Sequence, residues 1–179
     1  MPAVTLEQLL ESRDRRAAHQ KDLLGAHPGK SLLCMTVQLP GPEKRNALSL
    51  TLACAGVEAI RAAFPAGYEE LRDLETGYEA YFLLSMPAEE VKRQACQLED
   101  THPLGRLLDL DVLAIPGQTG NLQPLSRSDI GLPPRKCLLC EQPARYCMRA
   151  HTHSREALLA RIEQMIRSYG ISSAYSAAD

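Results

Sequence analysis

Hydrophobic residues recur along the chain at helical and at alternating spacings, and their order predicts the secondary structure. The pattern Thr5-x-x-Gln8 can form a capping box, and apolar residues follow it at helical spacing, so a helix is expected over residues 5–24. An apolar run over residues 31–39, with glycine and proline on both sides, predicts a buried strand. A second helix is expected over residues 46–64, with one apolar stripe. That stripe contains Leu50, Cys54, Val57, Ile60 and Phe64.

The middle of the chain predicts a hairpin, a helix and another strand. Residues 68–75 suit either helix or strand, and the turn at Thr76-Gly77 favours a strand. Residues 78–85 alternate with a period of two, which is typical of a strand. Pro87 then opens a helix with an acidic first turn. Residues 102–113 are largely aliphatic and suit a buried strand.

Placed end to end, these elements are a helix followed by βαββαβ, the order of a ferredoxin-like sheet. The expected fold class is α+β, with helices on one face of a mainly antiparallel sheet and a helical tail rich in cysteine and arginine. After a loop over residues 116–121, a short strand is expected over 122–126 and a final helix over 154–169. The last ten residues, rich in serine and alanine, should fray.

Length and composition limit the class of protein. The chain of 179 residues is long enough for one domain over 1–179, with a core over about 31–126 and a cysteine-rich tail over about 131–170. The net charge of −2 argues against a general nucleic-acid binder. No membrane-spanning run or export signal is present, so a cytoplasmic protein is expected, and its six cysteines should be reduced thiols or metal ligands.

Two aspartates interrupt the last predicted strand. Asp109 and Asp111 share one face, because successive side chains of a strand point to opposite faces. Burying both carboxylates is costly unless a cation or hydrogen bonds compensate them, and Mg²⁺ is the hard cation that one or two carboxylates commonly hold. The alternative is that the aspartates cap the strand end or pair with a nearby arginine.

A second group of candidate ligands lies in the tail. Cys137-x-x-Cys140 is followed by Cys147, His151 and His153, and three thiolates with one imidazole suit a tetrahedral structural Zn²⁺. Reduced buried thiols and a redox pair are the alternatives. Four protein ligands would leave no open position on the metal, so this zinc would hold the tail together and not act in catalysis.

Short motifs rich in charged residues, proline and glycine are spread over nearly the whole chain. They are Ser12-Arg13-Asp14-x-Arg16, Pro40-Gly41-Pro42-x-Lys44, His102-Pro103-Leu104-Gly105-Arg106, Asp109-x-Asp111, Ser126-Arg127-x-Asp129, Leu132-Pro133-Pro134-Arg135 and Cys137-Leu138-Leu139-Cys140-Glu141. Together they resemble the motifs of one known family, the apo-citrate lyase phosphoribosyl-dephospho-CoA transferases, also called holo-citrate lyase synthases. The resemblance implies an enzyme that moves the 5'-phosphoribosyl-3'-dephospho-CoA group from its donor, triphosphoribosyl-dephospho-CoA, to a serine of the citrate lyase acyl carrier subunit, with release of diphosphate.

The resemblance also suggests roles for single residues. Asp129 would add a third carboxylate beside the aspartate pair, although a polar turn is the plainer interpretation of its surroundings. Arg135 is the preferred clamp for the donor phosphates, because arginine holds phosphate by two parallel hydrogen bonds. His153 is favoured over His151 as the fourth zinc ligand. The further substrate-binding residues implied are Arg13, Arg16, Lys44, His102, Arg106 and Arg127.

Some alternatives stay open at this point. The arginines of the first helix would ordinarily form a solvated face. The general base could be Asp129, Asp109 or His102. Two other functions also fit the residues, a non-catalytic interaction module stabilised by zinc and a nucleotidyltransferase that uses ordinary nucleoside triphosphates. The interaction module would tolerate Asp→Asn changes in the aspartate strand. The nucleotidyltransferase would have the same metal site as the transferase but a different donor.

Overall fold

The computed structural model describes residues 3–65, 67–114 and 122–176. Its centre is a four-stranded antiparallel sheet with the strand order β2-β3-β1-β4. The order of elements from β1 to β4 is the strand and helix order expected from the sequence, so the class is α+β. The elements are α1 (Leu6–Ala26), β1 (Ser31–Val37), α2 (Ala47–Ala63), β2 (Tyr68–Leu74), β3 (Gly77–Leu84), α3 (Ala88–Thr101), the 3₁₀ turns η1 (Gly105–Leu107) and η3 (Ser128–Ile130), β4 (Leu108–Leu113), α4 (Ala144–Ala150) and α5 (Arg155–Ser176).

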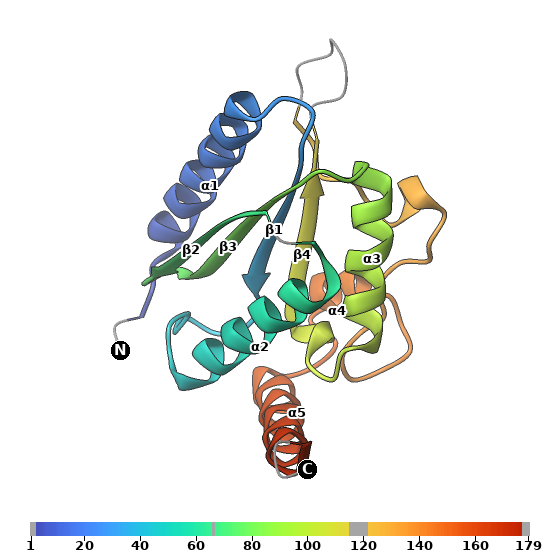
Figure 1. Ribbon diagram of the computed structural model, residues 1–179. Helices are drawn as coiled ribbons and strands as arrows, with labels where there is room; N and C mark the ends of the chain where they lie inside the picture. The colour runs from blue at the N-terminus through green and yellow to red at the C-terminus, as the bar shows by residue number, and fades with distance from the viewer. Residues whose placement is uncertain (1–2, 66, 115–121, 177–179) are drawn as a thin grey trace.

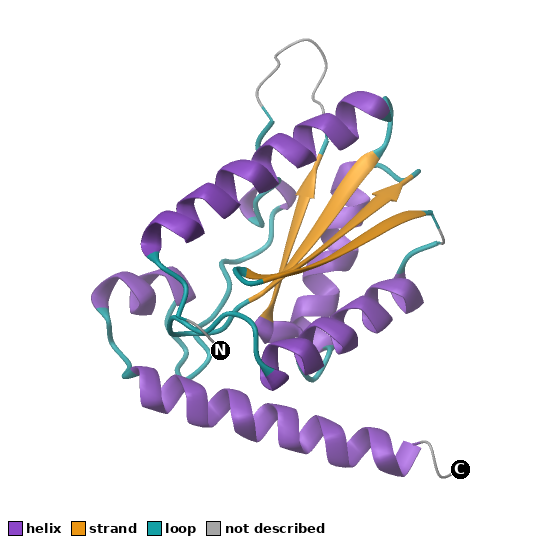
Figure 2. Cartoon of the chain, turned by 90° about the vertical axis from the view of Figure 1, so that its left-hand side faces the viewer, coloured by secondary structure: helices purple, strands orange, loops and turns teal. Residues whose placement is uncertain are grey.

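Helices cover both faces of the sheet, as Figures 1 and 2 show. Helices α2 and α3 pack on one face, where Ile60 and Val91 meet Leu110 in the larger core cluster. Helix α1 packs on the other face, where Leu24 meets Tyr81. The expectation that the helices share one face is therefore wrong for α1. Its apolar residues near the C-terminal end find a second apolar surface on the sheet, because β1 and β3 are buried on both faces.

Local signals in the sequence account for most element boundaries. Thr5 and Gln8 form the expected capping box, with hydrogen bonds of 2.9 and 3.2 Å. Residues 68–74 form the strand that the turn at Thr76-Gly77 favours, and Gly77 has the positive φ of 122° that the hairpin turn requires. The stripe expected on α2 is partly wrong, because Leu50 and Cys54 are exposed. The buried residues of α2 are Ser49, Leu52, Ala53, Ala55, Gly56, Val57 and Ile60.

The C-terminal third departs most from expectation. No strand forms over residues 122–126, although the Leu125 amide donates one 2.8 Å hydrogen bond to the Val112 carbonyl of β4. Helix α4 was not expected at all. Helix α5 continues to Ser176, so the expected fraying is wrong up to that residue, and residues 177–179 lie outside the described range, as does the loop expected over 116–121. No helix in the described part of the chain has the length and apolar content needed to cross a bilayer.

Gly56 sets how closely α2 approaches the sheet. A Cβ at this position would lie 2.5 Å from the sulfur of Met35 and 3.0 Å from Leu108. Gly56→Ala is therefore expected to cost about 1–3 kcal/mol through overpacking, which outweighs the helix propensity that alanine adds. Gly25→Ala is the control, because nothing lies within 4 Å of a Cβ there. Urea unfolding should find the Gly56 variant less stable than the Gly25 variant, and equal stabilities would show that α2 can shift freely.

Candidate active site

Strand β4 holds the aspartate pair on the face that α1 covers. Leu108, Leu110 and Val112 are at most 1% exposed and face the core under α2 and α3. Asp109 and Asp111 therefore share the opposite face, as the alternation predicts. In the sheet register, Asp109 lies beside Thr36 of β1 and Asp111 beside Cys34.

The outer edge of β4 is completed by charged side chains of α3. The Leu110 amide donates to the Glu99 carboxylate at 3.1 Å, and Lys92 Nζ donates to the Leu110 carbonyl at 3.0 Å. Both charged residues are buried, with 4% and 6% exposure. Arg135 adds hydrogen bonds to the carbonyls of Leu108 and Gly105. These contacts take the place of a fifth strand. They satisfy backbone N–H and C=O groups at the edge of β4 and so fix the position of the aspartate pair.

A third carboxylate on this face, Glu79 of β3, was missed by the sequence analysis. Thr36 is the register partner of both Asp109 and Glu79, so the three residues form one row across the sheet. Arg16 of α1 lies 3.2 Å from Glu79, and the Tyr81 hydroxyl donates to the same carboxylate. Glu79 could have been recognised in the sequence as an acidic residue within a strand that is otherwise apolar on both faces.

Burial and like charge act together on Asp111. Burial raises the pKa of this carboxyl, and the charge of Asp109 raises it further, while Lys92 and Arg16 act in the opposite direction. Asp109 is more open, with 41% of its side chain exposed, and one of its oxygens lies 3.8 Å from Arg135 Nη1. A cation beside the two carboxylates would therefore relieve a repulsion that the protein only partly compensates.

A cavity of about 630 Å³ opens beside Asp109 and gathers residues from several separate segments. Helix α1, the loop after β1 and the segment around η1 all contribute basic side chains, and the tail forms the remaining wall. Many of the site residues expected from the sequence are thereby brought together. Those that line the cavity are Arg13, Arg16, Lys44, Arg106, Asp109, Arg135, Cys137, Cys147 and His153.

The basic side chains of this cavity favour an anion. Burial lowers the pKa of Lys44, and the nearby charge of Arg13 lowers it further. Burial lowers the pKa of Arg106 in the same way, with Arg135 adding to the effect. The Nε atoms of Arg106 and Arg135 are buried and lack a hydrogen-bond partner among the described residues. An anionic group in the cavity would relieve this crowding of positive charge.

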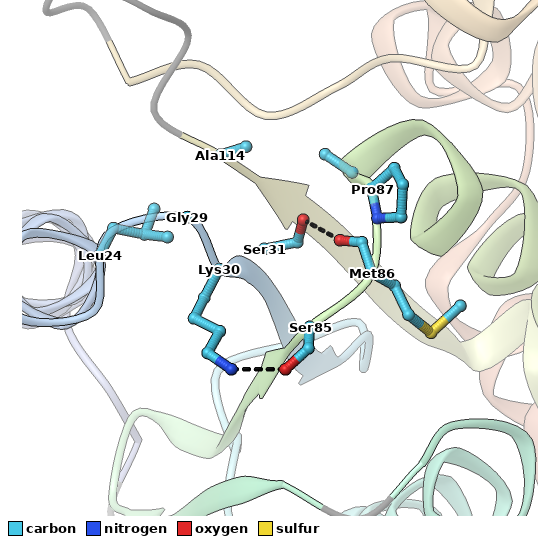
Figure 3. Close-up of a pocket in the computed structure, with 9 residues that line it drawn as sticks. Leu24, Gly29, Lys30, Ser31, Ser85, Met86, Pro87 and Ala114 are labelled. Atoms are coloured by element: carbon cyan, nitrogen blue, oxygen red, sulfur yellow. Dashed lines mark hydrogen bonds between the residues drawn. The ribbon is translucent and has the colours of Figure 1, made fainter.

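A second cavity, of about 420 Å³, lies at the other end of β1 (Figure 3). There Lys30 donates to the Ser85 hydroxyl, and Ser31 donates to the Met86 carbonyl at 2.7 Å. None of the described residues that line it is acidic, and none of them was expected in the site. The cavity beside Asp109 is therefore the stronger candidate.

The whole chain was also compared with known proteins. The family model described as apo-citrate lyase phosphoribosyl-dephospho-CoA transferase matches residues 4–169. The chain belongs to this family. A Shigella boydii serotype 18 protein of that name is 40% identical over 92% of this chain and 89% of its own length. The Haemophilus influenzae protein named Protein CitXG is 38% identical over 93% of this chain, which matches only 36% of that longer protein.

The match to the transferase family covers residues that the structure places outside the cavity. His102 ends α3, and its Nδ1 accepts a 3.1 Å hydrogen bond from the Leu104 amide. Arg127 pairs with Glu99 at 2.9 Å and with Asp100 at 2.8 Å on α3. None of His102, Arg127 and Asp129 lines the cavity.

Asp129 is not the third carboxylate of the aspartate pair in this structure. It accepts a 2.8 Å hydrogen bond from the Ser126 amide, and that bond lowers its pKa. This is the polar turn that the sequence left as the alternative. Of the three candidates for the general base, Asp109 alone lines the cavity.

The expected zinc ligands of this transferase also converge. The ligand atoms of Cys137, Cys140, Cys147 and His153 all lie within 4.8 Å of one another. Within the described part of the chain, this is the one group of three or more Cys, His, Asp or Glu side chains close enough to share a metal ion. Among the described residues, Asp109 and Asp111 thus offer two carboxylates without a third ligand of these types.

Proposed function

We propose that this chain transfers the 5'-phosphoribosyl-3'-dephospho-CoA group from its triphosphate donor to a serine of the citrate lyase acyl carrier subunit, with release of diphosphate. The observation that carries the proposal is the cavity in which Asp109 meets the basic side chains of α1, the loop after β1 and the tail. Such a cavity suits a substrate with several phosphates. Membership of the family supplies the identity of donor and acceptor.

Mg²⁺ fits the two aspartates by the chemistry of their oxygens. This ion is usually held by one or two carboxylates and completes its shell with water and substrate phosphates, so a third protein ligand is not needed. Asp109 and Asp111 would hold it. When bound, Mg²⁺ would neutralise charge that develops on the phosphates during transfer.

The residues of the chain itself would bind and orient the donor. Arg13, Lys44 and Arg106 present positive charge to the triphosphate from three segments. The serine oxygen of the carrier attacks the phosphorus next to the ribose, the bond to diphosphate breaks, and the serine proton must leave. Of the three candidate bases named from the sequence, Asp109 is the one that lines the cavity, so we propose it as the acceptor of that proton.

We also infer that residues 31–113 form a ferredoxin-like core in one domain that spans the chain. The βαββαβ order and the antiparallel strand order β2-β3-β1-β4 support this inference. Helix α1 and the tail are then additions that build the cavity on one face of the sheet.

Weighing the carrier subunit tests the function. The protein is incubated with Mg²⁺, purified carrier subunit and triphosphoribosyl-dephospho-CoA, and the carrier is measured by intact-mass spectrometry. The expected result is a carrier heavier by one prosthetic group, blocked when the acceptor serine is replaced by alanine. A mass gain with ATP or another ordinary nucleoside triphosphate would favour the nucleotidyltransferase, and no gain with any donor would favour the interaction module.

Arg13→Ala is expected to weaken donor binding roughly ten- to a hundredfold, because a charge-assisted hydrogen bond contributes about 1.5–3 kcal/mol. Arg15→Ala is the matched control, since Arg15 lies on the same helix but is 67% exposed and pairs with Glu11 at 3.6 Å. Calorimetric titration with the donor, in the absence of the carrier, measures the donor affinity of both variants. Equal affinities of the two variants would show that the donor phosphates bind elsewhere.

A further inference from the structure

The segment before α5 has almost no apolar core of its own. From Gly131 to Ser154, a stretch that the structure describes throughout, Cys147 is the one buried residue. Helix α4 has only seven residues, and its Tyr146 and Met148 are 60% and 68% exposed. A helix this short is unstable alone in water. Leu138 packs against the cluster of Leu52 and Ile162, and hydrogen bonds of Arg106 and Arg135 link the segment to η1. These few contacts leave room for a further interaction that holds the segment in place.

The backbone of the segment brings four side chains to one point. The Cys137 amide donates to the Gln142 carbonyl at 2.7 Å, which closes a tight turn around Cys140. Helix α4 then carries Cys147, and His151 ends it in the left-handed conformation with φ of 48°. The chain thereby reverses, and His153 returns to Cys140, with its Nε2 3.3 Å from the Cys140 sulfur.

We propose that Cys137, Cys140, Cys147 and His153 bind one structural zinc ion. The sulfurs of Cys140 and Cys147 are 3.5 Å apart, and all four ligand atoms lie within 4.8 Å of one another. A tetrahedral zinc with Zn–S bonds of about 2.3 Å separates its sulfurs by about 3.8 Å, so the side chains need only small shifts to enclose the ion. Thiolate and imidazole ligands select zinc over Mg²⁺. All four positions are filled by the protein, so the ion has no open site for catalysis.

The ion would also shape the cavity beside Asp109. Cys137, Cys147 and His153 line that cavity, together with the neighbouring Met148 and His151. Zinc would therefore hold the part of the cavity wall that these residues form, and its loss would release that part. This role in donor binding rests on the proposed function, whereas the metal site itself does not.

Metal content and protection from protease test the proposal on the full chain. Zinc per protein is measured by mass spectrometry for the wild type, Cys140→Ser and Cys54→Ser, whose thiol is exposed on α2. Wild type and Cys54→Ser should each carry about one equivalent, and Cys140→Ser less than about a fifth of one. Trypsin should cut Cys140→Ser rapidly at Lys136, Arg145 or Arg149 and spare the other two.

A second measurement uses the wild type alone, in case Cys140→Ser does not fold. Chelation should expose the same trypsin sites, and added Zn²⁺ should protect them again, whereas added Mg²⁺ should not. Metal-free wild type that resists trypsin, or a disulfide between Cys140 and Cys147 in the purified protein, would overturn the proposal. The carrier assay separates this result from the proposed function. A zinc-loaded protein without transfer contradicts the function alone, and transfer in Mg²⁺ by protein that carries no zinc contradicts the zinc alone.

Discussion

Asp109→Asn and Asp111→Asn are each expected to lower the rate of transfer to the carrier by roughly a thousandfold or more and to leave the fold intact. Each amide keeps the shape of the side chain but loses the charge that, in our proposal, would hold Mg²⁺ beside the donor phosphates. Stabilisation of developing charge by a metal contributes several kcal/mol, and each 1.36 kcal/mol is tenfold in rate. Single-turnover transfer, followed by the mass of the carrier, measures the loss.

The pKa of Asp111 indicates that its amide variant will fold. Burial and Asp109 raise the pKa of this carboxyl in the folded protein, so its charged form is less favourable there than in the unfolded chain. The metal-free protein therefore loses stability as the pH rises from the unfolded pKa of this group towards its folded pKa. Asp111→Asn removes that loss, and its melting temperature at neutral pH should equal or exceed that of the wild type.

The charge-matched control for this pair is Asp22→Asn, since Asp22 is exposed on α1 and does not line the cavity. Its rate should match that of the wild type. Near-normal transfer by both Asp109→Asn and Asp111→Asn in Mg²⁺ would show that transfer does not depend on a metal ion held by these aspartates. A melting temperature well below that of the wild type would instead assign Asp111 a structural role.

Glu99→Ala is expected to destabilise the protein by about 3–5 kcal/mol, the range found when one partner of a buried ion pair is removed. Glu99 is 4% exposed, accepts the Leu110 amide and pairs with Arg127 at 2.9 Å and with Arg135 at 3.5 Å. The change leaves a backbone donor of β4 and two arginines without this acceptor. Urea unfolding measures the loss.

Glu90→Ala, on the same helix, is the control for Glu99→Ala. Glu90 is exposed in the first turn of α3, so its removal should cost no more than about 1 kcal/mol through the helix dipole. Equal losses in the two variants would show that the edge of β4 does not depend on Glu99. The strand would then have to be fixed by its pairing with β1 alone.

The order of elements and the shared face of the aspartates could be predicted because they depend on local periodicity. Asp109 and Asp111 alternate with Leu108 and Leu110, and the period of two fixes their face whatever the rest of the chain does. The Cys/His cluster was predictable for a similar reason. Its members lie within seventeen residues, from Cys137 to His153, so local turns suffice to bring them together.

The features that could not be predicted from the sequence depend on contacts between distant segments. Glu79 lies thirty residues before Asp109, and only the strand order places β1 between them. The side of the sheet on which α1 packs was predicted wrongly. Helix α1 buries the polar residues Ser12 and Gln20 as well as leucines, so its buried face could not be recognised from apolar residues alone. Its arginines would ordinarily form a solvated face, yet Arg16 pairs with Glu79 on the face of the sheet that α1 covers.

The strand wrongly expected over residues 122–126 has a related cause. The edge of β4 that such a strand would occupy is already satisfied in large part by Glu99, Lys92 and Arg135. These side chains belong to a helix and a loop, so no periodicity in residues 122–126 could have revealed the competition. The segment contributes a single backbone hydrogen bond to Val112.

The location of the donor is the central claim, and a crystal structure of the protein with triphosphoribosyl-dephospho-CoA and Mg²⁺, in the absence of the carrier, tests it most directly. We expect the triphosphate in the cavity among Arg13, Lys44 and Arg106. We expect the metal ion on Asp109 and Asp111 of β4. A triphosphate bound in the cavity beside Lys30, or a metal ion held away from both aspartates, would contradict it.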